Sequence, residues 1–197
     1  MADDRESKDL SLDELVEDLH GAARRRRQEA SHELAIRARE DAAQLMGIAD
    51  ELVDALERPE AQTRWEALDA LSELARVDAD KVAGGFDGAE ASLFDDDSAT
   101  VRLSAFRFLT RLGSSAKARS DEAWPLLDEA VQCFHGDPEY RDMLGCLLDF
   151  AHGDISAATK KALVERFSFD ADSGRDYIKS CSAEIIEAAN SKSRKRK

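Results

Sequence analysis

Apolar residues recur along the chain at helical spacing. One stripe falls at positions i, i+3, i+7 and i+11, formed by Leu45, Ile48, Leu52 and Leu56. This spacing predicts one face of an α-helix with about 3.6 residues per turn. Three further stripes have the same character: Leu12, Leu15, Val16 and Leu19; Leu126 or Leu127 with Ala130 and Phe134; Leu163 and Phe167. The pattern therefore predicts an all-α chain.

A frame of basic and apolar positions repeats along the sequence. Residues 64–75 and 102–113 share Arg-x-x-Ala-(Leu/Phe)-x-x-Leu-x-x-Leu-(Ala/Gly), at a spacing of 38 positions. Weaker copies begin at Arg27, Arg141 and Lys179, at offsets of 37 to 39. Such regularity indicates tandem duplication. Because a helical stripe precedes each copy, the repeating unit is predicted to be helix, turn, helix.

Turn and capping residues separate these predicted helices. Breakers occur at residues 58–60, 95–98 and 136–139, and Ser11 and Glu14 have the spacing of a capping box. The segment KVAGGFDGAEASLF, residues 81–94, holds three glycines. Each glycine costs a helix about 1 kcal/mol relative to alanine. This segment is therefore predicted to be a weak or broken helix and a local hinge.

Residues 97–105, DSATVRLSA, resemble the second helix of HEAT repeats, in which an acidic or Pro-containing turn leads into Val-Arg-x-x-Ala. Residues 59–67 and 137–144 match this pattern in part. The resemblance covers about residues 11–190. It implies a right-handed α-solenoid of about five HEAT-like helix-turn-helix repeats with a period near 38 residues, whose terminal repeats act as polar caps. Residues 1–10 and 191–197 are then expected to be a disordered acidic N-terminus and a disordered basic tail.

The resemblance also explains why arginines occur inside an apolar frame. In HEAT-like proteins this arginine commonly pairs with an acidic turn residue of the same or the adjacent repeat. We therefore expect a structural ladder that consists of Arg27, Arg64, Arg102, Arg141 and Lys179, with Glu60, Asp97 and Asp137 as the respective partners of Arg64, Arg102 and Arg141. A partly buried guanidinium needs such acceptors. A ligand site at these residues is the alternative.

Charge is unevenly distributed along the chain. The formal net charge is −14 over 197 residues, although the last seven residues, SKSRKRK, contain five basic and no acidic side chains. An acidic body repels phosphate backbones over about 8 Å at physiological salt, so it does not favour nucleic-acid binding as a whole. The start MADDRESKDL lacks the features of a signal peptide, and no apolar run approaches the roughly 20 residues that span a bilayer. A cytoplasmic protein is predicted.

Metal and catalytic chemistry find little support in the sequence. Cys133, His135, Cys146 and His152 lie along one predicted hairpin and would spread over about 20 Å, too far to close a tetrahedral shell. The three cysteines of the chain are expected to be small core residues: Cys133, Cys146 and Cys181. No phosphate-binding loop and no nucleophile beside a base occurs at motif spacing. The sequence therefore predicts no enzyme, no cofactor and no metal.

Binding to a partner remains as the predicted function. Second helices usually line the concave face of HEAT-like proteins, which gives these candidate contacts: Trp65, Asp69, Leu103, Arg107, Arg111 and Asp142. Packing between repeats is the alternative for Trp65 and Leu103. Seven basic side chains offer contacts to phosphate or to an acidic partner: Arg24, Arg25, Arg26, Arg194, Lys195, Arg196 and Lys197. Nearby glutamates are expected to pair with some of them. We predict a non-catalytic protein-interaction scaffold, with nucleic-acid or ribonucleoprotein association second and a HEAT-like DNA glycosylase third.

Overall fold

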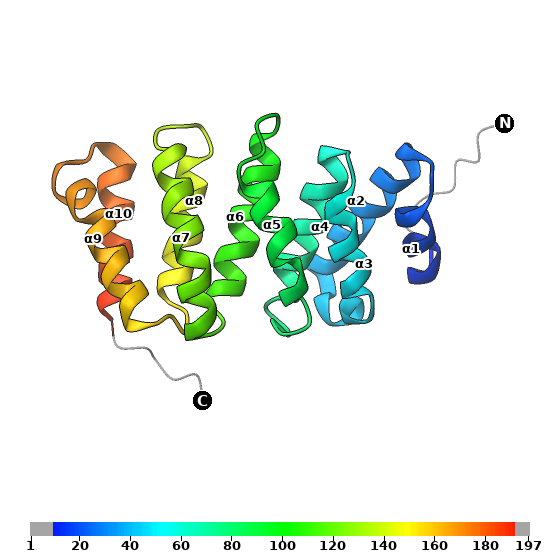
Figure 1. The fold of residues 1–197 in the computed structure, drawn as a ribbon, viewed down its shortest axis with the longest axis horizontal. Helices are drawn as coiled ribbons and strands as arrows, with labels where there is room; N and C mark the ends of the chain where they lie inside the picture. Colours follow the sequence, from blue (N-terminus) through cyan, green and yellow to red (C-terminus); the bar gives the residue numbers. More distant parts are fainter. Residues whose placement is uncertain (1–9, 192–197) are drawn as a thin grey trace. The chain divides into compact units, whose positions relative to one another are not determined.

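A computed structural model describes residues 10–191 of the chain (Figure 1). All regular elements in this range are helices, which confirms the all-α prediction. The chain divides into two compact units, Met1–Phe108 and Leu109–Lys197, and the boundary falls within α6 (Ala99–Gly113). The prediction of one domain over residues 11–190 stays a prediction, and the predicted terminal disorder lies almost entirely outside the described residues.

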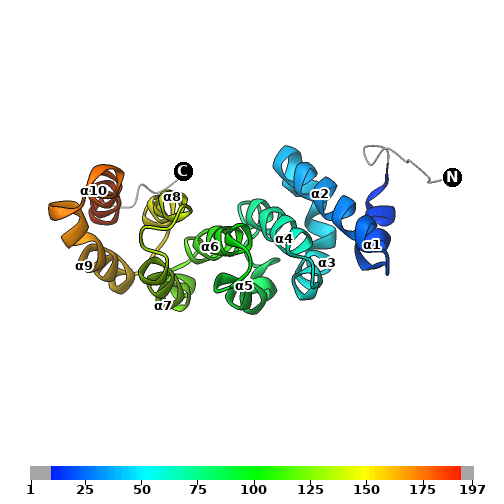
Figure 2. The same ribbon diagram turned by 90° about the horizontal axis from the view of Figure 1, so that it is seen from above.

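The first unit is built from helical hairpins. Its elements are α1 (Leu12–His20), α2 (Arg24–Asp41), the 3-10 helix η2 (Ala42–Ile48), α3 (Ala49–Asp54), the 3-10 helix η3 (Ala55–Glu57), α4 (Ala61–Leu74), the 3-10 helix η4 (Ala83–Gly85), α5 (Phe86–Leu93) and the first part of α6. Within this unit α1, α3 and α5 form one row, whereas α2, α4 and α6 form the other (Figure 2).

The second unit repeats this arrangement, with longer first helices than those of the first unit. It contains α7 (Lys117–Cys133), α8 (Tyr140–Ala151), α9 (Ala157–Ser173) and α10 (Asp176–Asn190). Within this unit α7 and α9 form one row, and α8 and α10 form the other (Figure 2). Gly113 lets the end of α6 pack closely here, because a Cβ atom at this position would lie 2.9 Å from the Cβ of Ala123 and 3.0 Å from the ring of Phe150.

The repeated apolar frame forms the core. Ala67, Leu71 and Leu74 in α4 are fully buried, as are the equivalent Ala105 and Leu109 in α6. Burying one leucine or isoleucine side chain stabilises a fold by about 1.5–3 kcal/mol. The frame therefore repeats because its apolar positions are those whose side chains pack between neighbouring helices.

One position of the frame is less buried in the second unit. Leu147 and Ile185 are fully buried, whereas the frame residues Leu148 and Ile186 are only half-buried. Arg141, which opens this copy of the frame, is exposed. The other frame positions stay buried, since Leu144, Ala151 and Ala189 are at most 3% exposed.

Two predictions about helix ends have different outcomes. The capping box is confirmed, because the amide of Glu14 donates to Ser11 Oγ at 3.3 Å and the amide of Ser11 donates to Glu14 Oε2 at 2.9 Å. The prediction that the stripe from Leu45 to Leu56 lies on one continuous α-helix was wrong, since this part of the chain is divided into η2, α3 and η3. The side chain of Asp41 accepts from the amide of Ala43 and so starts a new element at this point.

The glycine-containing segment is a broken helix, as predicted. Residues 83–85 form a 3-10 turn, and α5 is only 8 residues long. Before it, the carboxylate of Asp78 accepts from the amides of Asp80 and Lys81 and holds a turn where a helix was expected to begin. Hinge motion at this segment stays a prediction.

Candidate interaction surface

Arg27 and Glu60 form a buried ion pair that joins α2 to the start of α4. Arg27 Nε lies 3.3 Å from Glu60 Oε2, Arg27 Nη2 donates to Glu60 Oε1, and Arg27 Nη1 donates to the carbonyl of Gly21 at 2.8 Å. The two side chains are only 11% and 6% exposed. The hydrogen bond from Arg27 is the main cause that holds the pKa of Glu60 below its usual value.

Arg64 pairs differently from the sequence prediction, whereas the expected pairing of Arg102 with Asp97 stays a prediction. Arg64 forms an ion pair with Asp95, and Arg102 donates to the carbonyl of Asp95 at 2.8 Å. Glu60 was therefore the wrong partner for Arg64, since it belongs to Arg27. Arg27 and Arg64 each reach the turn of the following repeat, because their side chains extend sideways from one second helix toward the next.

The two basic frame residues of the second unit make other contacts. The guanidinium carbon of Arg141 lies 5.5 Å from the ring centroid of Tyr177, a cation–π distance. Within residues 10–191 the structure shows no ion pair between Arg141 and Asp137, so that expected pairing was wrong. Lys179 Nζ donates to the carbonyl of Asp172 at 2.9 Å.

A charged network crosses the second helices of the first unit. Asp69 of α4 accepts from Arg39 of α2 at 3.0 Å and from Arg107 of α6 at 2.7 Å. Glu66 lies 2.8 Å from His32 Nδ1 and 4.0 Å from Arg39 Nη2. Sequence reasoning singled out Asp69 and Arg107 but missed the other three residues. The available signal was opposite charge at separations of 30 to 38 positions.

Trp65 and Leu103 flank this network on one side. Both are half-buried, and each lies one helical turn before a member of the Asp69–Arg107 pair. The ion pairs run in the same order along α2 and α4, so these two helices are parallel. Trp65 and Leu103 occupy equivalent positions of α4 and α6, four residues before Asp69 and Arg107. We name this surface the second-helix face; it consists of His32, Arg39, Trp65, Asp69, Leu103 and Arg107.

Two predicted contact residues belong to the second unit. Arg111 is half-buried and follows Arg107 by one turn of α6. Asp142 is exposed on α8. The second-helix face, as defined, does not include them.

The basic cluster at the start of α2 is partly neutralised. Arg25 Nε lies 2.6 Å from Glu29, and Arg26 lies 3.5 Å from Asp18. Arg24 is exposed and has no ion pair within residues 10–191. The predicted phosphate contacts Arg194, Lys195, Arg196 and Lys197 lie outside the described residues.

The cysteines and histidines do not converge on one point. Cys133 is exposed at the last position of α7, so its prediction as a core residue was wrong, while Cys146 and Cys181 are half-buried. His135 instead lies 3.7 Å from Asp170 and packs against the ring of Tyr140. Over residues 10–191, no three His, Cys, Asp or Glu side chains are arranged to hold a metal ion.

The chain resembles HEAT-like and armadillo repeat proteins in structure, although no family model and no curated protein sequence matches it. A designed armadillo repeat protein in complex with the peptide (KR)4 superposes with a TM-score of 0.73 and 20% identity, covering 89% of this chain and 80% of that one. A computationally designed armadillo repeat protein for modular peptide recognition superposes with a TM-score of 0.70 and 18% identity, covering 88% of this chain and 80% of that one. The archaeal HEAT-like repeats protein from Thermococcus onnurineus NA1 superposes with a TM-score of 0.57 and 15% identity, covering 89% of this chain and 69% of that one.

These similarities show the fold class and confirm the HEAT-like resemblance. The chain is an all-α helical repeat protein that resembles HEAT and armadillo solenoids. The count of five repeats, the 38-residue period and the right-handed sense stay predictions. Within residues 10–191, no helix combines the length and the apolar character needed to cross a membrane.

Proposed function

We propose that this chain is a non-catalytic, cytoplasmic adaptor that binds a protein or peptide segment on its second-helix face. The observation that carries the proposal is the pair Trp65 and Leu103, half-buried at equivalent positions of α4 and α6 beside a network of ion pairs. Aromatic and aliphatic side chains surrounded by polar groups are the usual centre of a protein interface. A partner that covers these two side chains would remove their remaining apolar area from water.

The charged network supports binding by fixing the surface around these residues. The carboxylate of Asp69 holds two guanidinium groups, which come from the helices on either side. Side chains that are held in place before binding lose less conformational entropy when a partner arrives. The side chain of Arg39 remains 51% exposed, so its guanidinium can donate to carbonyl or carboxylate groups of a bound segment.

The shared fold gives further support. One of the designed armadillo repeat proteins that superpose on this chain is in complex with a peptide, and another was designed for peptide recognition. We extend this to the present chain as a proposal about its binding mode. The second-helix face carries both signs of charge, with Asp69 between Arg39 and Arg107.

Nucleic-acid binding through Arg24, Arg25 and Arg26 and the basic residues of 192–197 is the second candidate. Arg24 supports it, because an exposed arginine in the first turn of a helix adds to the positive end of the helix dipole. The ion pairs of Arg25 and Arg26 weaken it. No observation supports the third candidate, a DNA glycosylase.

Affinity capture with two matched variants tests the proposal. Trp65→Ala with Leu103→Ala alters the second-helix face, whereas Arg24→Ala, Arg25→Ala and Arg26→Ala alter only the basic cluster. We expect the first variant to lose a protein partner that the second retains, with and without nuclease treatment. Capture should change little between 50 and 200 mM salt, whereas phosphate binding weakens by orders of magnitude over about that range. Loss of the partner on nuclease treatment would favour the second candidate.

A further inference from the structure

The acidic and basic side chains of the charged network at the second-helix face differ in how far they reach the solvent. The side chains of Asp69 and Glu66 are only 17% and 8% exposed. Those of His32, Arg39 and Arg107 are 55%, 51% and 35% exposed. The carboxylates are therefore the inner part of the network, and the basic groups are the outer part that a partner meets.

The oxygens of the two carboxylates already face basic groups of the chain. Asp69 Oδ2 accepts from Arg39 at 3.0 Å, and Asp69 Oδ1 accepts from Arg107 at 2.7 Å. Glu66 Oε1 lies 2.8 Å from His32 Nδ1, and Glu66 Oε2 lies 4.0 Å from Arg39 Nη2. A lysine or arginine of a bound segment would therefore have to displace one of these internal partners. It would also approach two guanidinium groups of its own charge, which opposes binding.

Arg39 offers hydrogen-bond donors that the chain does not use. A guanidinium has five N–H groups. Between residues 10 and 191, the side chain of Arg39 makes one hydrogen bond, from Nη2 to Asp69. Its other N–H groups can donate to a carboxylate, and such bonds are about twice as strong as those between neutral groups. The outer part of the network therefore matches a partner that carries carboxylates.

A peptide fits this face better than a polyanion. The network already contains the carboxylates of Asp69 and Glu66, and the whole chain has a net charge of −14. A phosphate backbone carries a charge at every step and is repelled by an acidic protein over about 8 Å. A peptide can place one or two carboxylates at the arginines and an apolar side chain against the half-buried Trp65 and Leu103. The observations therefore favour a protein segment.

We propose that the segment bound on the second-helix face carries Asp or Glu side chains next to an aromatic or aliphatic one. Its carboxylates accept hydrogen bonds from Arg39 and lie beside Arg107. Its apolar side chain covers Trp65 and Leu103. This inference rests on the proposed function, because it names the chemistry of the partner at that same surface.

Selection from a library of short random peptides tests this chemistry on the full-length protein. Peptides displayed on phage are selected on the parent, and those that also bind Trp65→Ala with Leu103→Ala are discarded. We expect the remaining peptides to be enriched in Asp and Glu beside apolar residues and depleted of Lys and Arg. Enrichment of Lys and Arg, or no charge preference, would overturn this inference and leave the proposed function standing. If every selected peptide binds the variant equally well, both fail.

Matched charge variants test the role of Arg39 without altering the apolar residues. Arg39→Gln removes an exposed positive charge from the face, whereas Arg25→Gln removes one from the same helix outside the face, where Arg25 pairs with Glu29. We expect the Kd of a selected acidic peptide, measured by fluorescence anisotropy, to rise about five-fold or more in Arg39→Gln and less than about two-fold in Arg25→Gln. Equal changes in the two variants would contradict the proposal. Tighter binding of oligouridylate than of the peptide would assign the face to nucleic acid and overturn it as well.

Discussion

Replacing Glu60 with glutamine removes the negative charge that Arg27 faces in the interior of the first unit. The side chain keeps its size, and Arg27 keeps its hydrogen bond to the carbonyl of Gly21. Glutamine offers one acceptor oxygen where glutamate offers two, so one of the two hydrogen bonds from Arg27 is lost. We therefore expect Glu60→Gln to destabilise the first unit without changing its fold.

The magnitude follows from how little water reaches the pair. A hydrogen bond that involves a charged group contributes about 1.5–3 kcal/mol, and breaking a buried ion pair costs about 3–5 kcal/mol. With side chains that are 11% and 6% exposed, we expect a loss of about 3 kcal/mol in the free energy of unfolding. Arg25 and Glu29 form a matched control, since they are 80% and 51% exposed. Glu29→Gln should cost no more than about 0.5 kcal/mol.

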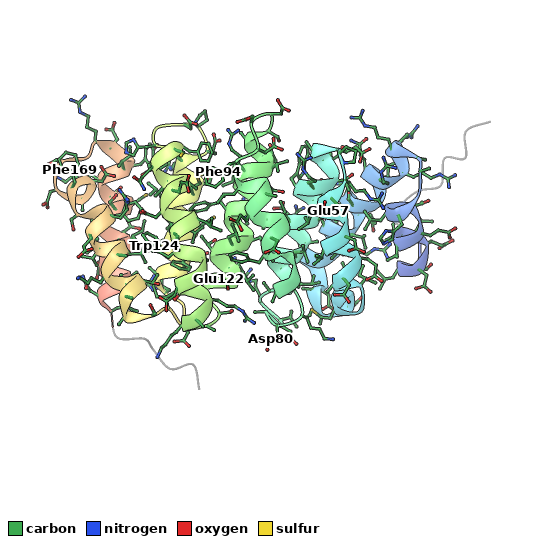
Figure 3. All side chains as sticks on the ribbon, in the orientation of Figure 1. Glu57, Asp80, Phe94, Glu122, Trp124 and Phe169 are labelled. Atoms are coloured by element: carbon green, nitrogen blue, oxygen red, sulfur yellow. The ribbon has the colours of Figure 1, made fainter. Side chains whose placement is uncertain are left out.

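The two tryptophans of the chain allow the first unit to be observed separately. Trp65 lies in the first unit and Trp124 lies in the second, on α7 (Figure 3). In a Trp124→Phe background, fluorescence reports only on the surroundings of Trp65. For a urea dependence of about 2 kcal/mol per molar, Glu60→Gln should lower the unfolding midpoint by about 1.5 M. Equal shifts for Glu60→Gln and Glu29→Gln would refute the reasoning.

The pH dependence gives a second test of the same pair. Arg27 lowers the pKa of Glu60 in the folded protein. The ion pair therefore contributes fully to the free energy of unfolding above the ordinary glutamate pKa of about 4.3, and this contribution is lost as the pH falls through the pKa of folded Glu60. The difference in stability between the parent and Glu60→Gln should therefore shrink as the pH falls below about 4. A difference that is constant down to acid pH would show that the charge of Glu60 contributes nothing.

Two further sets of variants probe packing by thermal unfolding. The hydroxyls of Thr63 and Ser182 are buried and have no hydrogen-bond partner among residues 10–191, so Thr63→Val and Ser182→Ala should each stabilise the protein by about 1 kcal/mol. A loss of stability would reveal a bond that these hydroxyls make. A Cβ on Gly84 meets no atom within 4 Å, so Gly84→Ala should stabilise by about 0.5–1 kcal/mol. A Cβ on Gly88 would lie 2.8 Å from Leu56 Cδ1 and 3.0 Å from its Cβ, so Gly88→Ala should destabilise by about 1 kcal/mol or more. Changes of the same sign at both glycines would contradict this distinction.

The sequence identified features that depend on residues close together in the chain. Ser11 and Glu14 are three residues apart, and their capping box follows from the geometry of a single helix turn. The buried positions of α4 and α6 repeat because each helix must present the same face to its neighbours. Local periodicity was therefore sufficient to predict the helical repeat fold and most of its core.

Contacts between repeats were harder to predict. Arg64 was matched with Glu60, which is nearby in sequence, but its carboxylate partner is Asp95, 31 positions away. The choice depends on the rotation and spacing of adjacent helices, which a pattern along one helix does not contain. The burial of Leu147 in place of Leu148 has the same origin. His32, Arg39 and Glu66 were missed because each looks like an ordinary surface residue until the helices are packed.

Site-specific photo-crosslinking tests the central proposal most directly. A benzophenone amino acid is placed at Leu103 in the second-helix face and, as a control, at Phe169, which is 74% exposed on α9 (Figure 3). The probes are activated in native extract with and without nuclease. The account predicts a discrete protein adduct from position 103 that survives nuclease and is absent from position 169. An adduct only from position 169, or one from position 103 that nuclease abolishes, would contradict it.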